Sequence, residues 1–271
     1  LVDIGGGSTE VCWIAIDRSG GSAGAAMAIK LLDMTSLPWG VVTLTEMTDI
    51  LEKVVKAVNI PVIGDGGCGF GNPLNTWRTV REYESIGVAG VNLEDQVYPK
   101  RCGHLAGKQV VAPAEMVEKI RAAVDARKDP DFVITARVDS IAIHGLDDAI
   151  KRANIYVEAG ADMIFVEAPT TEADIQRIIN ETKAPSWINM VEGGKTPLVP
   201  IPKLQEMGAA LVDYGPLLLF AAAGGVERAL QALKRDGTSA NHLKELMLFN
   251  EINAINRIDD FRDMETRYTK R

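Results

Sequence analysis

Residues 91–108 read Val-Asn-Leu-Glu-Asp-Gln-Val-Tyr-Pro-Lys-Arg-Cys-Gly-His-Leu-Ala-Gly-Lys, an apolar strand that continues into a charged loop. The strand ends in the carboxylates of Glu94 and Asp95, and a divalent cation such as Mg²⁺ prefers oxygen ligands of this kind. In the loop, Cys102 lies between basic residues, whose positive potential favours a thiolate. The stretch therefore predicts that acid chemistry and metal chemistry meet at the end of one strand.

A structural explanation of the same residues stays open. A charged loop often follows a strand, and cysteine is among the residues most often buried without a chemical role. Under this interpretation, Asp95 and Lys108 are solvated surface charges.

Six short runs rich in β-branched residues are typical of strands, and helical patterns follow them. The runs cover residues 61–65, 90–94, 133–139, 163–167, 186–190 and 210–214. Apolar residues on one face mark the helical patterns, as in residues 115–127 and 146–159. Because strand and helix alternate, we expect a parallel sheet.

The predicted strands are apolar along most of their length and become polar at the carboxyl end. The polar residues at these ends are Asp65, Glu94, Arg137 with Asp139, Glu167, Asn189 and Tyr214. An open doubly wound sheet gathers functional groups at one switch point, whereas here every strand supplies one, as at the mouth of a (β/α)8 barrel. We therefore expect an α/β fold in which residues 1–271 form a single (β/α)8 TIM-type barrel domain. Structural ion pairs are the alternative explanation of these charges.

Length and composition agree with one domain that acts on a small molecule. A chain of 271 residues that is 46% hydrophobic can bury one large core. Its net charge of -8 argues against nucleic acid or an anionic membrane as partner. The longest apolar stretch, residues 216–225, is shorter than the roughly 20 residues of a bilayer span. Three cysteines at unrelated spacings suit a reducing compartment, so we expect a cytoplasmic protein.

Two further helical patterns, residues 239–247 and 251–267, follow the predicted barrel. They carry an apolar stripe made of Leu248, Ile252, Ile255, Ile258 and Phe261. Such a stripe packs either on its own barrel or on a neighbouring subunit. We expect residues 239–271 to form a C-terminal helical extension of the domain, with a swap between the subunits of a homo-oligomer (dimer or tetramer) as one arrangement.

Several short motifs are shared with one enzyme family. They are Gly-Phe-Gly-Asn-Pro at 69–73, Glu-Asp-Gln at 94–96, Lys-Arg-Cys-Gly-His at 100–104, Ala-Arg at 136–137, Val-Glu-Ala at 166–168 and Asn-Met-Val-Glu-Gly-Gly-Lys-Thr-Pro at 189–197. With these motifs the chain resembles the isocitrate lyase and phosphoenolpyruvate mutase superfamily, nearest to its methylisocitrate lyase and 2,3-dimethylmalate lyase-like branch. The resemblance runs from about residue 37 to residue 271, and the Lys-Arg-Cys-Gly-His run is its most specific part.

This resemblance implies a Mg²⁺-dependent retro-aldol lyase, with Mn²⁺ as an alternative ion. Its substrate would be a 2-hydroxy or 2-oxo di- or tricarboxylate of the methylisocitrate, dimethylmalate or oxaloacetate type. The resemblance assigns Asp65 as the direct metal ligand and Glu94 as the residue that holds metal-bound water. It assigns Cys102 as the acid that protonates the departing enolate, and Lys100 and His104 as the residues that position this thiol.

The same resemblance implies how the substrate is bound. Arg137 would hold the carboxylate and the developing charge, Glu167 and Asn189 would order the second half of the substrate, and Gly103 would offer a backbone N–H. A Ser-Gly pair that binds carboxylate through backbone amides also belongs to the family pattern. The candidates for it are Ser19, Gly20 and Gly21.

Two positions depart from the family pattern. Gly67 stands where the family has the second aspartate of an Asp-x-Asp pair, and Trp39 stands where another aspartate follows the proline. Groups that support a metal from its outer shell can be worth about 10-fold to 100-fold in affinity or activity. Weak Mg²⁺ binding, or a non-catalytic barrel homologue, is therefore an alternative.

Substrate and reaction are only partly indicated by the remaining residues. The loop at residues 192–195 lacks the bulky middle residue that methylisocitrate lyases tend to carry, so the resemblance favours a malate-type substrate. A phosphonate or carboxyphosphonoenolpyruvate mutase-type enzyme is a second alternative, although Cys102 favours carbon-carbon cleavage because the phosphonate branches lack this residue. Residues 1–10 resemble the phosphate-binding turn of the actin-like ATPase fold, and a glycine-rich lead-in is the other explanation of them.

Overall fold

The computed structural model describes residues 2–4, 11–13 and 42–269. Its elements are β1 (Val2–Ile4), β2 (Val11–Trp13), α1 (Leu44–Ala57), β3 (Val62–Asp65), α2 (Pro73–Ser85), β4 (Gly90–Glu94), α3 (Pro113–Ala126), β5 (Val133–Val138), α4 (Ile141–His144), α5 (Leu146–Glu158), β6 (Met163–Val166), α6 (Glu172–Glu181), β7 (Ser186–Asn189), α7 (Ile201–Met207), β8 (Leu211–Asp213), α8 (Leu217–Asp236), the 3₁₀ helix η1 (Ala240–Glu245), α9 (Phe249–Ile255) and α10 (Ile258–Tyr268). The chain divides into two compact units, Leu1–Leu219 and Phe220–Arg271.

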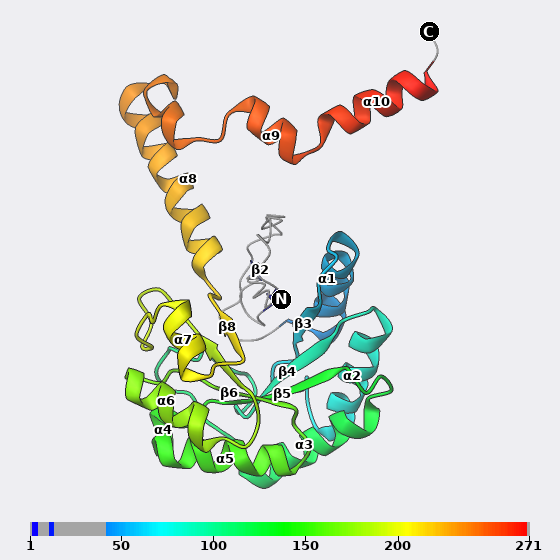
Figure 1. Cartoon of the computed structure of the whole chain (residues 1–271), viewed down its shortest axis with the longest axis vertical. Helices are drawn as coiled ribbons and strands as arrows, with labels where there is room; N and C mark the ends of the chain where they lie inside the picture. The colour runs from blue at the N-terminus through cyan, green and yellow to red at the C-terminus, as the bar shows by residue number, and fades with distance from the viewer. Residues whose placement is uncertain (1, 5–10, 14–41, 270–271) are drawn as a thin grey trace. The chain divides into compact units, whose positions relative to one another are not determined.

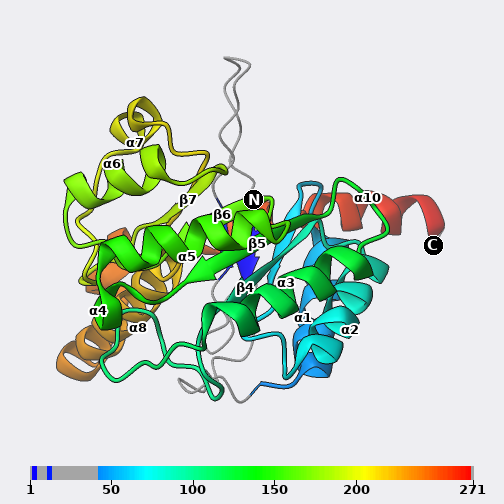
Figure 2. The ribbon, with the colours of Figure 1, turned by 90° about the horizontal axis from the view of Figure 1, so that it is seen from below.

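The first unit is built on one sheet with the strand order β2-β1-β3-β4-β5-β6-β7-β8. Strands β1 and β2 are antiparallel, and every other neighbouring pair is parallel. Helices α1, α2, α3, α5 and α6 pack in series, each against the next. Figures 1 and 2 show α3 and α5 running along one face of the sheet. Strands β3 and β4 are buried along their whole length, as expected of parallel strands covered on both faces.

The six strands predicted from the sequence are present as β3 to β8, in parallel order, which confirms the α/β class. Closure into an eight-stranded barrel stays a prediction. The strand pairs among the described residues run from β2 to β8 and do not join the two ends of the sheet. Residues 14–41 lie outside the described part of the chain.

Local sequence signals fix the helices on either side of β3. Thr43 and Glu46 form a capping box at the start of α1, and Asn72 caps α2, whose first residue is Pro73. The buried face of α1 consists of Met47, Leu51 and Val54, spaced by four and three residues. These helices hold β3 and the loop that follows it, residues 66–72, in place on the core.

The second unit contains most of α8 together with η1, α9 and α10. The sequence predicted one helical pattern over residues 251–267, whereas the structure has two helices there. Arg257 separates them, because it adopts a left-handed φ of 53°. Four of the five residues of the predicted apolar stripe are exposed in the structure. Among the described residues, no helix combines the length and the apolar character needed to cross a bilayer.

Candidate active site

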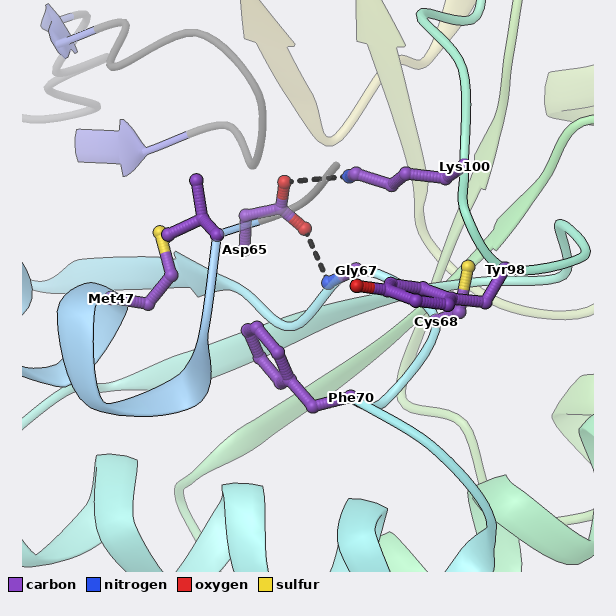
Figure 3. Close-up of a pocket in the computed structure, with 8 residues that line it drawn as sticks. Met47, Asp65, Gly67, Cys68, Phe70, Tyr98 and Lys100 are labelled. Atoms are coloured by element: carbon purple, nitrogen blue, oxygen red, sulfur yellow. Dashed lines mark hydrogen bonds and ion pairs between the residues drawn. The ribbon is translucent and has the colours of Figure 1, made fainter. Parts of the chain in front are cut away.

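Polar side chains from the carboxyl ends of β3, β4 and β5 lie together. Glu94 and Arg137 face each other in register on β4 and β5. Lys100, from the loop after β4, places its Nζ 2.9 Å from Asp65 Oδ2 and 3.2 Å from Glu94 Oε1 (Figure 3). The contact between Lys100 and Asp65 brings the loop to the carboxyl end of β3. Cys102 follows Lys100 by only two residues and lies in the same loop.

Burial and paired charge set the ionisation of this cluster. Burial raises the pKa of Glu94 to about 7, against the opposing effects of Lys100 and Arg137. Burial alone would lower the pKa of Lys100, but the carboxylates of Asp65 and Glu94 together outweigh it and raise this pKa above its usual range. Lys100 therefore stays charged, and its ammonium group occupies a place between two carboxylates that suits a cation.

A small cavity lies beside Asp65. Its volume is about 20 Å³, which is enough for one water-sized group. The lining residues are Val42, Met47, Asp65, Gly67, Cys68, Phe70, Tyr98 and Lys100. Figure 3 shows the apolar side chains of Met47 and Phe70 on one side of Asp65 and the ammonium group of Lys100 on another. The space next to the aspartate is thus bordered by carbon on one side and by charge on the other.

Arg137 joins this cluster to a second one at the end of β6. One guanidinium nitrogen lies 2.9 Å from Glu167 Oε2, and the guanidinium group stacks 5.0 Å from the ring centre of Phe165. Burial would raise the pKa of Glu167, but Arg137 and His104 outweigh it and hold this pKa below its ordinary range. Asn189 Nδ2 lies 3.5 Å from the same carboxylate. An ionised Glu167 therefore forms the centre of the second cluster.

His104 connects two loops at this second cluster. Its Nδ1 accepts a hydrogen bond of 3.0 Å from the backbone N–H of Lys195, and its Nε2 lies 3.1 Å from Glu167 Oε1. With Nδ1 accepting, a neutral imidazole carries its proton on Nε2, facing Glu167. His104 is therefore held by Glu167 and by the loop after β7.

Gly103 lies directly on the second cluster. A Cβ atom at this position would come within 2.4 Å of an Arg137 nitrogen and of Glu167 Cγ, so no larger residue fits. The adjacent Cys102 is exposed. The loop thus holds Cys102 between Lys100, which contacts Asp65, and Gly103, which contacts Arg137 and Glu167.

Two residues interpreted as solvated surface charges are buried, so that interpretation was wrong. Asp95 is 0% exposed, and it accepts hydrogen bonds from the Asp139 backbone N–H (2.8 Å) and from the Tyr156 hydroxyl (2.9 Å). Lys108 is also buried, and its Nζ lies 3.0 Å from Asp139 Oδ1. The sequence carried a signal for only one member of this network, Asp139, because it follows Arg137 by two residues and strand alternation places both on one face.

The donor set at Asp65 fits a hard divalent cation. Mg²⁺ is usually held by one or two carboxylates and keeps several waters. Asp65 and Glu94 supply two buried carboxylates around the position that the Lys100 ammonium group now occupies. Among the described residues, no three His, Cys, Asp or Glu side chains cluster as a metal site. Ser19, Gly20 and Gly21 lie outside the described residues, so the predicted carboxylate-binding pair has no described position.

Tyr83→Phe is expected to lower the free energy of unfolding by about 1–2 kcal/mol. The buried Tyr83 hydroxyl donates a 2.7 Å hydrogen bond to the backbone carbonyl of Asp65, and the variant leaves this carbonyl without that donor. The measurement is urea unfolding of both proteins, in which the midpoint should fall while the slope stays constant. An unchanged midpoint would show that the hydroxyl does not support the strand end that carries Asp65.

Comparison with known families places the chain clearly. The family model described as phosphoenolpyruvate phosphomutase matches residues 19–234. The chain is 42% identical to 2,3-dimethylmalate lyase from Eubacterium barkeri, over 84% of this chain and 79% of that protein. It is 42% identical to a probable 2-methylisocitrate lyase from Corynebacterium glutamicum, over 85% of this chain and 78% of that protein. It is 40% identical to the chloroplastic carboxyvinyl-carboxyphosphonate phosphorylmutase of Arabidopsis thaliana, over 91% of this chain and 74% of that protein.

Solved structures agree with the sequence relatives. The crystal structure of 2,3-dimethylmalate lyase, described as a PEP mutase/isocitrate lyase superfamily member, aligns with a TM-score of 0.76 and 34% identity, over 84% of this chain and 77% of that one. Phosphonopyruvate hydrolase in complex with oxalate and Mg²⁺ aligns with a TM-score of 0.72 and 29% identity, over 85% of this chain and 80% of that one. The predicted family is confirmed: this chain belongs to the phosphoenolpyruvate mutase and isocitrate lyase superfamily of enzymes.

Proposed function

We propose that this chain is a Mg²⁺-dependent carbon-carbon lyase that cleaves a methyl-substituted malate by a retro-aldol reaction. The observation that carries the proposal is the position of the loop after β4. Its Lys100 contacts Asp65 and its Gly103 contacts Arg137 and Glu167, with Cys102 between them. The relatives named as lyases support carbon-carbon cleavage as the reaction type.

The second cluster provides for substrate binding. Arg137 would bind a substrate carboxylate and the negative charge that develops during cleavage by a charge-assisted hydrogen bond from its second terminal nitrogen, because Nε and the first terminal nitrogen already contact Asp139 and Glu167. Glu167 fixes Arg137 through a contact of 2.9 Å and would orient the second half of the substrate together with Asn189. Asn189 Oδ1 is buried and has no hydrogen-bond partner among the described residues, so it is available to a substrate hydroxyl group.

Cys102 would supply the proton that completes the reaction. In the cleavage of 2,3-dimethylmalate, the C2 hydroxyl gives its proton to a water molecule as the C2–C3 bond breaks, and C2 becomes the carbonyl of pyruvate. The electron pair of that bond stays on C3 as an enolate, which takes one proton to become propionate. A thiol, with an unperturbed pKa of about 8.5, can donate this proton near neutral pH.

Asp65 and Glu94 would hold the Mg²⁺ ion, and Mn²⁺ is an alternative because it takes the same oxygen ligands. A bound Mg²⁺ supplies a Lewis acid that polarises the oxygen on C2 of the substrate. Lys100 lies within hydrogen-bonding distance of both carboxylates and would neutralise them when no metal is bound. The similar phosphonopyruvate hydrolase, solved with oxalate and Mg²⁺, supports this use of the site.

The cavity beside Asp65 supports the choice of a methyl-substituted substrate. It offers about 20 Å³ next to the apolar side chains of Val42, Met47 and Phe70, and a methyl group is comparable to a water molecule in size. Filling this space with a methyl group would also displace water from apolar surface. An unsubstituted malate or oxaloacetate would leave it empty.

Comparison of substrates tests the proposal. Cleavage of 2,3-dimethylmalate to pyruvate and propionate should show a kcat/KM about 10-fold or more above that for cleavage of unsubstituted malate to glyoxylate and acetate, because one methyl group in a fitted pocket is worth roughly 1–3 kcal/mol. The assay uses lactate dehydrogenase to reduce the 2-oxo acid product, which is pyruvate from 2,3-dimethylmalate and 2-methylisocitrate and glyoxylate from malate. The loss of oxaloacetate at a matched concentration is followed directly by its ultraviolet absorbance. A higher kcat/KM for oxaloacetate than for both methylated acids would contradict the proposed substrate class.

The second candidate is a phosphonate or carboxyphosphonoenolpyruvate mutase-type reaction, favoured by the likeness to the phosphorylmutase and to phosphonopyruvate hydrolase. Carbon-phosphorus products detected by ³¹P NMR, without pyruvate or glyoxylate from the malates, would favour it. A non-catalytic barrel would show neither product, and Mg²⁺ at millimolar concentration would leave its melting temperature unchanged.

The exposed apolar residues of the second unit support a homo-oligomer. Leu248, Ile252, Ile255 and Phe261 are each more than 40% exposed in the chain, which is costly for large apolar side chains in water. We propose that the extension of residues 239–271 buries this stripe in a dimer or tetramer. Light scattering coupled to size-exclusion chromatography measures the mass, and a monomer at micromolar concentration would contradict this assembly.

A further inference from the structure

We propose that Lys108 is a positioning residue that holds the Cys102 loop, residues 97–109, closed over the site by joining the Gly103 carbonyl to Asp139. Its Nζ donates to the Gly103 carbonyl oxygen at 2.5 Å and to Asp139 Oδ1 at 3.0 Å. The Lys108 side chain is only 2% exposed. A buried lysine is costly unless it is paired and hydrogen-bonded, so these two contacts account for its burial.

Asp139 ties this loop contact to the arginine of the site. Arg137 donates to Asp139 Oδ2 at 2.8 Å through Nε and to Oδ1 at 3.2 Å through a terminal nitrogen. Asp139 Oδ1 therefore accepts hydrogen bonds both from Lys108 of the loop and from Arg137 of β5. Burial would raise the pKa of Asp139, but Arg137 and Lys108 outweigh it and hold this pKa well below its usual range. One ionised carboxylate thus fixes Lys108 and Arg137 together.

Asp139 is itself held by a network of buried side chains around Asp95. Its backbone N–H donates to Asp95 Oδ1 at 2.8 Å, and Asp95 also accepts from the Tyr156 hydroxyl at 2.9 Å and from Arg152 at 3.3 Å. Every one of these side chains is buried. The network therefore anchors Lys108 to Asp139, directly after β5, and Asp139 is supported through Asp95 by two residues of α5.

The base of the loop is closed by backbone contacts, and Lys108 extends this closure to the tip. The Val97 N–H donates to the Gln109 carbonyl at 2.8 Å, and Gln96 pairs with Val110 as an isolated bridge. Lys108 then reaches across the loop to the Gly103 carbonyl, beside Cys102. Gly103 is the residue that lies against Arg137 and Glu167. Loss of the Lys108 ammonium group should therefore release the tip while the base stays paired.

The test compares Lys108→Met with Lys119→Met as matched control. Both variants remove a buried ammonium group that donates to a backbone carbonyl, but Lys119 lies on α3 and donates to Cys68, which is not a residue of the Cys102 loop. Limited trypsin digestion followed by mass spectrometry measures the rate of cleavage after Arg101. We expect this rate to rise about 10-fold or more in Lys108→Met, the effect of losing one charged hydrogen bond, and to stay unchanged in Lys119→Met.

The kinetic part of the test rests on the proposed lyase function. Lys108→Met should lower kcat about 10-fold with KM within about 2-fold, since the thiol is misplaced while Arg137 still binds substrate. Lys108→Arg, which keeps a cation, should recover part of both losses. Faster cleavage after Arg101 in a protein with no lyase activity would support the loop contact and reject the proposed function.

Equal cleavage rates in Lys108→Met and Lys119→Met, at matched melting temperatures, would overturn the proposal whatever happens to kcat. If Lys108→Met does not fold, Lys108→Gln carries the same test, because it keeps a hydrogen-bond donor without the charge. A fall in kcat without faster cleavage would likewise overturn it, since Lys108 would then act otherwise than through the loop.

Discussion

Replacing Cys102 by serine is expected to lower kcat for carbon-carbon cleavage by about 10²-fold to 10⁴-fold, the range typical of losing a general acid. A serine hydroxyl occupies nearly the same space but gives up its proton far less readily than a thiol. KM should change little, because the residues proposed to bind the substrate, Arg137, Glu167 and Asn189, lie at strand ends and not in the loop. Pyruvate release over time, under saturating 2,3-dimethylmalate and Mg²⁺, measures the effect.

The matched control is Ala106→Ser, which places the same hydroxyl on another exposed residue of the Cys102 loop. It should keep its kcat within about 2-fold, because a surface substitution of this kind disturbs neither packing nor charge. Cys102 is exposed, so Cys102→Ser should melt at the wild-type temperature. Turnover by Cys102→Ser at the wild-type rate would remove the thiol from the mechanism, and the proton would have to come from another group near Arg137.

The strands and their polar ends could be predicted because both follow from periodicity. Each of the six strands has an apolar run that stops at a polar residue, and parallel order then brings these ends to one edge. Asp65, Glu94, Arg137 and Glu167 were found in this way. In the structure Arg137 contacts Glu94 and Glu167 directly, and Lys100 links Asp65 to Glu94. Asp139 follows Arg137 by two residues at the end of β5, so strand alternation also predicts that both side chains lie on one face.

The buried polar network under the loop could not be predicted in the same way. Asp95, Lys108 and Arg152 are separated by up to 57 residues, and charged side chains in a loop or helix are exposed far more often than buried. Their burial depends on the loop folding back onto β5, which no local pattern specifies. The break at Arg257 was missed for a related reason, since the apolar spacing continues across it.

Introducing an aspartate at residue 67 is expected to tighten Mg²⁺ binding by about 10-fold to 100-fold, the range found for groups that support a metal site. Gly67 adopts a left-handed φ of 47°, which aspartate tolerates better than most residues. A Cβ atom here would meet Lys100 at 3.8 Å, an ordinary van der Waals distance. The new carboxylate would therefore join Asp65 and Glu94 without a clash. Isothermal titration of the variant and the wild type with MgCl₂ measures the change.

Gly67→Asn is the control, since it carries the same backbone cost and nearly the same shape without the charge. If only Gly67→Asp binds Mg²⁺ more tightly, the gain comes from the added carboxylate, and its kcat should saturate at lower Mg²⁺ than that of the wild type. If both variants gain equally, side-chain oxygen and not charge is the cause. A higher melting temperature of Gly67→Asp without metal, together with unchanged Mg²⁺ affinity, would contradict the prediction. It would show that the new carboxylate pairs with Lys100, whose ammonium group already lies between Asp65 and Glu94, in place of the metal.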